Sequence, residues 1–257
     1  MRFTNKVFLI TGAGGDIGTY SASRLAKEGA KLALVDIRQD ALDRAAERCG
    51  LPPDRCITIQ ADVTKEEQVK EYVEKAVAAF GRIDVFFSLA GMQGDFCPLT
   101  EINMDRFDAL TRLNVYAPLM GLKYVLPVMY GQESGSVINV ASQSVLRGGD
   151  GAGAYPITKS AVIQMTKIAA IEAGRHNVRV NVICPALVDG GSMMQHVIHT
   201  VGGDDEAGFR RRAEMMIPLG RWPSMEDIAN TVMYLASDES SFINGLVLPI
   251  DGGQTCK

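Results

Sequence analysis

The sequence lacks the features that direct a protein to a membrane or to nucleic acid. No stretch of the 257 residues approaches the ~20 apolar residues that a membrane-spanning helix needs. The apolar run Val7 to Ile10, after a polar start, is too short for a signal peptide. The net charge is −4, and the basic run Arg210 to Arg212 is too short to bind a polyanion. We therefore expect a cytoplasmic protein that binds neither nucleic acid nor membranes.

Paired cysteines and clustered metal ligands are missing as well. The odd number and the spacing of the five cysteines match no zinc motif and indicate unpaired thiols in a reducing compartment: Cys49, Cys56, Cys97, Cys184 and Cys256. His196 and His199 are spaced as on a helix, but no third ligand falls in register with them. We expect no metal site.

Repeats, low-complexity tracts and linkers are absent too, which favours one domain over the whole chain, residues 1–257. Hydrophobic residues make up 47% of the sequence and charged residues 22%, as is usual in globular proteins.

Strands and helices are expected to alternate along the chain. The first strand, Lys6 to Thr11, holds an unbroken apolar run, which is typical of a parallel strand covered on both faces. Further strands are expected at residues 31–36, 56–60, 85–89, 136–141, 178–184 and 246–250, and helices at about 17–28, 65–80, 104–129, 155–171 and 225–237. This alternation predicts an α/β fold with a doubly wound parallel sheet of about seven strands and helices on both faces.

A glycine-rich turn, Thr11 to Gly18, joins the first strand to the first helix. Its glycines allow the backbone to approach a pyrophosphate, and the helix N-terminus offers free N–H groups. Asp36 ends the second strand, where a carboxylate accepts hydrogen bonds from an adenosine ribose and repels a 2′-phosphate. Arg38 could neutralise that charge, but Asp16 adds another, so we favour NAD over NADP. The alternatives are a turn without a ligand and Asp36 as the N-cap of a helix that starts near Ala41.

Tyr155 and Lys159 lie one turn apart on a helix that is expected to begin at or just before the tyrosine, with Pro156 in its first turn. An adjacent ammonium group lowers the pKa of a phenol, which makes it a candidate general acid–base near neutral pH. The alternative is a half-exposed tyrosine beside a solvated lysine. Other polar or glycine residues end the predicted strands, which places them at one edge of the sheet and points to a single site: Gly12, Asp36, Asp62, Gly91, Ser142 and Pro185.

In their order and spacing these motifs resemble the short-chain dehydrogenase/reductase family, with its single-domain, Rossmann-like fold. The resemblance runs from about Lys6 to Gly253 and points to the NAD-preferring branch. It implies that Tyr155 exchanges a proton with the substrate oxygen and that Ser142 hydrogen-bonds that oxygen. It also implies that Lys159 holds the nicotinamide ribose and lowers the tyrosine pKa, while Asn114 holds a water that links Lys159 to solvent. It implies cofactor contacts from Gly12, Asp16, Ile17, Gly18, Asp36, Ile37, Asp62, Val63, Ala90, Gly91, Tyr155, Lys159, Pro185 and Val188.

Each of these residues has a structural alternative, and the chain departs from the family pattern in places. Ser142 could merely end a strand, Asn114 could bond only to backbone, and Asp62 could cap a helix. Asp16 stands where the family has a glycine, and Gly15 stands where NADP-preferring members often carry a basic residue. Ser88-Leu89 replaces the usual Asn-Asn pair. Gly190 replaces a threonine that often contacts the carboxamide, and Ser192 is a candidate substitute for that threonine.

Residues 186–222 resemble the family's variable substrate lid, and they are rich in methionine. The expected substrate-contacting residues are Met92, Gln143, Val145, Met193 and Trp222. We expect an NAD-dependent oxidoreductase that transfers hydride between nicotinamide and a secondary alcohol or ketone of moderate size. The alternatives are an NADPH-dependent 3-oxoacyl thioester reductase and, in another class, a non-catalytic nucleotide-binding sensor or scaffold. The resemblance also implies a homotetramer.

Overall fold

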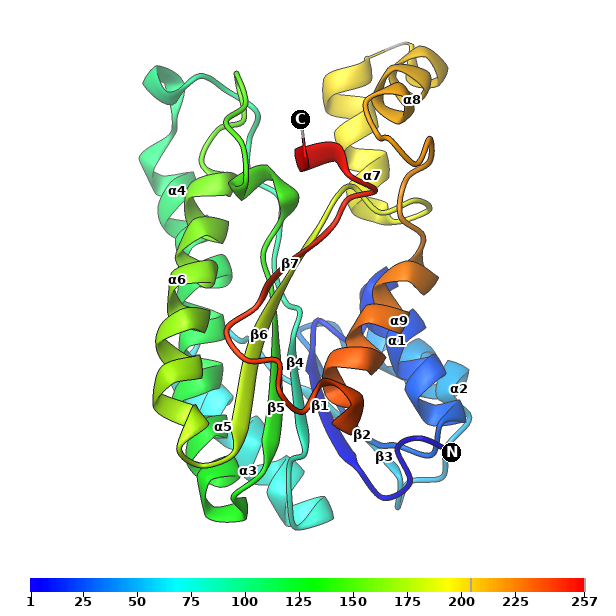
Figure 1. Cartoon of the computed structure of the whole chain (residues 1–257), viewed down its shortest axis with the longest axis vertical. Helices are drawn as coiled ribbons and strands as arrows, with labels where there is room; N and C mark the ends of the chain where they lie inside the picture. The colour runs from blue at the N-terminus through cyan, green and yellow to red at the C-terminus, as the bar shows by residue number, and fades with distance from the viewer. Residues whose placement is uncertain (204, 257) are drawn as a thin grey trace.

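The computed structural model describes residues 1–203 and 205–256. One parallel sheet runs through the molecule in the order β3-β2-β1-β4-β5-β6-β7 (Figure 1). Its strands are β1 (Val7–Thr11), β2 (Lys31–Asp36), β3 (Cys56–Gln60), β4 (Val85–Ser88), β5 (Gly135–Val140), β6 (Val178–Pro185) and β7 (Val247–Ile250). The prediction of a doubly wound parallel sheet is confirmed.

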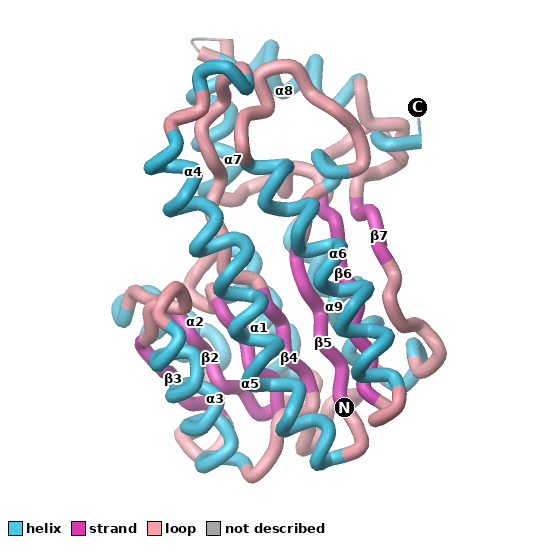
Figure 2. The backbone as a smooth tube through the Cα atoms, turned by 90° about the vertical axis from the view of Figure 1, so that its left-hand side faces the viewer, coloured by secondary structure: helices cyan, strands magenta, loops and turns pink. Residues whose placement is uncertain are grey.

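Helices cover both faces of the sheet. One face carries α1 (Asp16–Lys27), α2 (Gln39–Cys49) and α9 (Met225–Ala236), and the other carries α3 (Glu66–Phe80), α4 (Met104–Thr111), α5 (Ala117–Gln132) and α6 (Tyr155–Gly174) (Figures 1 and 2). No helix within residues 1–203 and 205–256 is long and apolar enough to cross a bilayer.

Burial on both faces explains the apolar strands. In β1, Leu9 packs into the core beneath α3, α5 and α6, whereas its neighbours Phe8 and Ile10 pack into the core beneath α1, α2 and α9. Because successive strand side chains point to opposite faces, a strand between two helix layers is apolar at every position.

The strand order reverses direction between β1 and β4, which are hydrogen-bonded neighbours with Thr11 opposite Ser88. Such a reversal opens a crevice outside the carboxyl ends of the strands. The glycine-rich turn after β1 and the segments after β4 and β5 all reach this edge.

The expected helix over residues 104–129 is interrupted. A π-helical turn, Arg112–Tyr116, separates α4 from α5 and contains the buried Asn114. Pro118 has no N–H to donate to the carbonyl of Asn114 in an α-helical pattern, which accounts for a wider turn at this place.

A separate helical segment rises above the carboxyl edge of the sheet (Figure 1). It consists of α7 (Ser192–Val197), the π turn Ile198–Gly202 and α8 (Glu206–Met215). Met194, Ile198, Ile217 and Trp222 form a small apolar core of its own. This segment falls within the expected lid range 186–222, of which residue 204 lies outside the described residues.

Candidate active site

Only glycine fits at three positions of the glycine-rich turn, and at one of them, Gly14, a Cβ would lie 2.6 Å from the Cβ of Ala41. Gly12 has a φ of 67°, and a Cβ there would lie 3.0 Å from the backbone of Ala90. A Cβ on Gly18 would collide with the carbonyl oxygen of Gly12. The turn therefore forms a shallow cradle at the start of α1 in which backbone N–H groups are open to an anion such as a pyrophosphate.

Asp36 closes one side of this cradle. Its carboxylate accepts hydrogen bonds from the backbone N–H of Gly14 at 3.0 Å and from that of Arg38 at 3.1 Å. Each oxygen keeps a lone pair for a ribose hydroxyl. The N-cap of α2 is Arg38, so the alternative reading of Asp36 as that cap is wrong.

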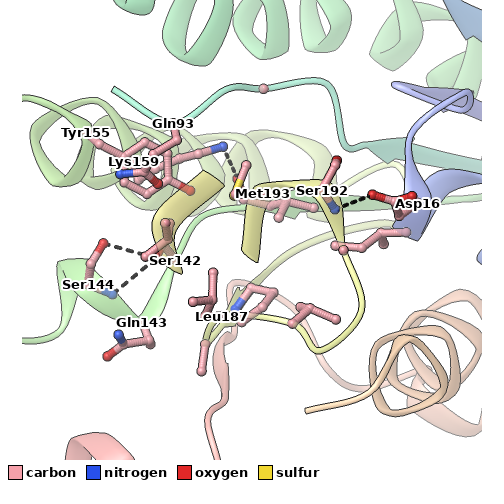
Figure 3. A pocket seen from close by; sticks show the side chains of 18 of the residues that line it. Asp16, Gln93, Ser142, Gln143, Ser144, Tyr155, Lys159, Leu187, Ser192 and Met193 are labelled. Atoms are coloured by element: carbon pink, nitrogen blue, oxygen red, sulfur yellow. Dashed lines mark hydrogen bonds between the residues drawn. The ribbon is translucent and has the colours of Figure 1, made fainter. Parts of the chain in front are cut away.

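Ser142, Tyr155 and Lys159 meet on one wall of the crevice (Figure 3). Ser142 follows β5, and its hydroxyl accepts from the backbone N–H of Ser144 at 3.2 Å. Tyr155 begins α6 as expected and is 7% exposed. The Nζ of Lys159 donates to the carbonyl of Val140 at 2.9 Å and lies 5.8 Å from the centre of the Tyr155 ring.

The expected lowering of the tyrosine pKa is wrong. Burial raises the pKa of Tyr155 to about 12, although the hydroxyl of Ser142 acts in the opposite direction. Burial also lowers the pKa of Lys159 to about 8. A medium of low dielectric disfavours the charged forms of both side chains, and the expectation from the four-residue spacing took no account of this burial.

Asn114 fixes the backbone beside this group. Its side chain accepts from the N–H of Met92 at 3.0 Å and donates to the carbonyl of Met92 at 3.0 Å and to Thr158 Oγ1 at 3.2 Å. Thr158 in turn donates to the carbonyl of Tyr155 at 2.8 Å. Gly91 is closely enclosed, because a Cβ there would lie 3.1 Å from Lys159 Nζ and 3.2 Å from Asn114 Oδ1.

A cavity of about 550 Å³ connects the cradle with the wall that carries Ser142, Tyr155 and Lys159, and it extends beneath α7 and α8. Most of the predicted site residues line it: Gly12, Asp16, Ile17, Gly18, Asp36, Ala90, Gly91, Ser142, Gln143, Tyr155, Lys159, Pro185, Val188, Met193 and Trp222.

Several predicted residues lie elsewhere. Met92 lines a neighbouring cavity of about 290 Å³, and Val145 packs against the small core that contains Val162. Asp62 binds Thr64 with its carboxylate, while Lys65 is the N-cap of α3. Asp62, Val63 and the 58% exposed Ile37 follow β3 or β2 at the same edge of the sheet but outside the cavity lining.

The cavity is also lined by residues that were not predicted, notably Gln93, Phe96, Ser144, Leu187, Phe209 and Gln254. Ser144 is adjacent to the predicted Gln143, so the strand end after Ser142 was a usable signal for it. Gln254 comes from the end of the chain, and no local pattern associates it with Tyr155.

Known proteins resemble this chain over almost its full length. The family model described as enoyl-(acyl carrier protein) reductase matches residues 12–255. The levodione reductase of Leifsonia aquatica is 38% identical over 99% of this chain and 96% of its own. The meso-2,3-butanediol dehydrogenase of Serratia marcescens is 34% identical over 99% of this chain and 96% of its own. A 3-oxoacyl-(acyl carrier protein) reductase of Thermotoga maritima is 35% identical over 98% of this chain and 99% of its own.

Solved structures agree with this fold over nearly the whole chain. A crystal structure of levodione reductase has a TM-score of 0.95 and 36% identity, covering 99% of both chains. NAD+-bound xylitol dehydrogenase has a TM-score of 0.93 and 35% identity, covering 98% of this chain and 100% of its own. ElxO with NADP bound has a TM-score of 0.89 and 28% identity, covering 98% and 99%. With a cradle, a buried tyrosine–lysine pair and these relatives, the chain belongs to the short-chain dehydrogenase/reductase family of nicotinamide-dependent oxidoreductases that act on alcohols and ketones.

Proposed function

We propose that this enzyme uses NAD to interconvert an uncharged secondary alcohol and its ketone, with Tyr155 as the general acid–base. The meeting of Ser142, Tyr155 and Lys159 in one cavity with the glycine cradle carries this proposal. The glycines permit the tight turn that forms the cradle, because side chains at Gly12 and Gly18 would collide with the backbone of Ala90, Gly12 and Ala13. The names of the relatives, a dione reductase and a diol dehydrogenase, support an alcohol or ketone as substrate.

Ser142, Tyr155 and Lys159, which together form the catalytic wall of the cavity, carry out the proposed chemistry. When bound, the nicotinamide ring supplies or accepts the hydride. During ketone reduction Tyr155 donates its phenolic proton to the substrate oxygen, and the hydroxyl of Ser142 hydrogen-bonds the same oxygen, so that two groups stabilise the charge developing there. Lys159, anchored to Val140, holds the ribose and stabilises the phenolate that remains.

Asn114 is proposed to complete the proton path through its backbone. Pro118 deprives the Asn114 carbonyl of its α-helical donor, which favours that oxygen as the site of a relay water. The side chain of Asn114 is already engaged with Met92 and Thr158, so its proposed task is to hold the surrounding backbone in place.

We assign the NAD preference to Asp36. Asp36 is 9% exposed. A 2′-phosphate bound beside its carboxylate would bring a second negative charge next to a nearly buried anion. Arg38 lies nearby, but its Nε is 3.9 Å from Asp36 Oδ1 and its side chain is mostly exposed. Because the arginine faces solvent, it offsets little of this repulsion.

The charge pattern of the cavity favours a neutral substrate. Among the described lining residues the charged ones are Asp16, Asp36, Arg38 and Lys159, all at the cradle or the catalytic wall. The part of the cavity beneath the lid is lined mainly by apolar side chains: Met193, Val197, Phe209, Ile217 and Trp222. The main polar groups there are the side-chain amides of Gln93, Gln143 and Gln254. No basic side chain among them would hold the phosphate of an acyl carrier, which disfavours the 3-oxoacyl thioester reductase. Retention of both Tyr155 and Lys159 disfavours the non-catalytic sensor.

The function is tested on a panel of secondary alcohols, with turnover measured as nicotinamide absorbance in the presence of NAD or of NADP. It should include matched pairs of cyclic alcohols that carry either a carboxamide or a carboxylate. We expect turnover with NAD and a kcat/KM at least about tenfold higher for the neutral member, because an unpaired carboxylate in an apolar cavity is costly. A carboxylate or thioester substrate that outperforms the neutral alcohols would refute the proposed substrate class.

We further propose that residues 1–257 act as one domain with residues 186–222 as a substrate lid. We also propose that the enzyme is cytoplasmic, where five free thiols remain reduced.

A homotetramer is proposed from apolar side chains exposed on the outer sides of α5 and α6. Leu119 is 50% exposed, Ile168 49% and Ile171 81%. Such an apolar surface is typical of a protein–protein contact.

Charging this surface should dissociate the enzyme. We expect the double substitution Ile168→Glu and Ile171→Glu to reduce the light-scattering mass from four subunits to fewer, because burying two carboxylates in an apolar contact is unfavourable. Leu99→Glu, at a residue that is 71% exposed outside these helices, is the control and should leave the mass unchanged. A wild-type protein with the mass of one subunit would contradict the tetramer.

A further inference from the structure

One hydrogen bond crosses the mouth of the cavity from the phosphate cradle to the lid. Asp16 is the first residue of α1, and its Oδ2 accepts from the backbone N–H of Ser192, the first residue of α7, at 2.7 Å (Figure 3). The two residues are 176 positions apart in the chain. Both line the cavity.

The lid helix depends on this contact for its cap. The N-cap of α7 is Gly191, which has no side chain and makes no capping hydrogen bond. A helix N-terminus leaves its first N–H groups without intrahelical partners, and a nearby side-chain oxygen normally satisfies one of them. Asp16 does so from across the cavity, so the capping group of the lid helix belongs to the cofactor cradle.

Further contacts hold the segment around α7 together. Its two ends are joined by the hydrogen bond from Asp189 N to the carbonyl of Pro223 at 2.8 Å. Arg210 on α8 binds Asp189 at 2.7 Å, which ties the lid helices to the segment before α7. Gly190, with a φ of 77° and open space around it, lies between that segment and α7 and provides a point of rotation.

We propose that Asp16 is a positioning residue that latches the lid over the bound dinucleotide. A glycine at this position, the pattern that the family resemblance led us to expect, has no such group. The hydrogen bond is charge-assisted, since a carboxylate accepts it, and the N-terminus of α7 adds a favourable dipole. The latch keeps α7 against the cradle and slows the departure of cofactor. It rests on the proposed use of a dinucleotide at the cradle and not on the identity of the alcohol.

Two substitutions remove the latch from opposite sides. Asp16→Gly removes the acceptor. Ser192→Pro removes the donor, and proline suits this first helical position because Gly191 before it is extended, with φ −87° and ψ 153°. Asp16→Asn keeps an acceptor oxygen, and Asp40→Gly removes a carboxylate from the first turn of α2 as the matched control.

Two rates are measured. Stopped-flow fluorescence gives the rate of NADH release, and trypsin digestion under saturating NADH gives the rate of lid cleavage at Arg210 to Arg212. We expect Asp16→Gly and Ser192→Pro each to accelerate release and lid cleavage about tenfold, as loss of one charge-assisted hydrogen bond implies. The double variant should be no faster than either single one, because both remove the same contact. Asp16→Asn should stay within about threefold of wild type, since its amide oxygen can still accept, and Asp40→Gly should not change either rate.

Wild-type rates in both single variants would overturn the latch, and so would additive effects in the double variant. An Asp16→Asn protein as fast as Asp16→Gly would also overturn it, because the charge in the cradle and not the hydrogen bond would then be responsible. If Asp16→Gly does not fold, the comparison of Ser192→Pro with Asp16→Asn decides the question. Failure of the proposed function shows differently: the wild type would bind no NADH, or would turn over no alcohol while the release rates still changed.

Discussion

Replacing Tyr155 with phenylalanine is expected to lower kcat by about 10²- to 10⁴-fold while NADH still binds. The substitution removes a single oxygen from a ring that stays buried at the start of α6, so the cavity keeps its shape. What disappears is the proton donor that the reduction step requires, and a positioned general acid–base contributes a factor of about this size. Nicotinamide absorbance on the best alcohol of the panel measures kcat, and NADH fluorescence measures binding.

Tyr124→Phe is the matched control for this prediction. It removes another tyrosine hydroxyl, which donates to Glu66 at 2.9 Å on the surface and faces no part of the cavity lining. Its kcat should equal that of wild type. If Tyr155→Phe also turned over at the wild-type rate, another group would have to exchange the proton, and the proposed mechanism would be abandoned.

Replacing Asp36 with serine is expected to reduce the preference for NAD over NADP, expressed as the ratio of the two kcat/KM values, by about 100-fold. Hydrogen bonds to a charged partner are worth about 1.5–3 kcal/mol, and a factor of ten corresponds to about 1.4 kcal/mol, so their loss alone weakens NAD by about tenfold or more. Relief of the repulsion between the carboxylate and a 2′-phosphate favours NADP in addition.

The carboxylate of Asp36 also binds the backbone of Gly14 and Arg38, so folding must be checked by thermal unfolding. Asp43→Ser, which removes an exposed carboxylate of α2 that binds Gln39, is the control and should leave the ratio unchanged. A wild-type enzyme that prefers NADP would contradict the assignment of Asp36.

Local pattern was sufficient for the fold and for assigning most of the predicted site residues to one edge of the sheet. The apolar run of β1 indicated a strand between two helix layers, and Phe8, Leu9 and Ile10 do alternate between the two cores. Because parallel strands deliver their carboxyl ends to one edge, residues that end separate strands could be assigned to one place without knowledge of the contacts. Ser142 after β5 and Asp36 at the end of β2 reached the cavity in this way.

Side-chain direction and burial could not be read in the same way. Val145 is two residues beyond Gln143, yet Gln143 lines the cavity while Val145 packs into a small core. The 3-10 turn that holds both rotates each residue by about a third of a turn, which a residue list does not reveal. The pKa values of Tyr155 and Lys159 depended on how completely the fold removes them from water, and their four-residue spacing carried no information on that.

The sequence by itself determined the alternation of strands and helices, the glycine cradle, the acidic end of β2 and the tyrosine–lysine helix, because each depends on residues within a few positions of one another. The tertiary structure decided which of these side chains share a cavity, that Gln254 joins them from the end of the chain, and that Asp16 binds the first residue of α7, 176 positions away. Such contacts depend on how the strands are ordered in the sheet and on where α7 lies, and these are set by packing over the whole molecule.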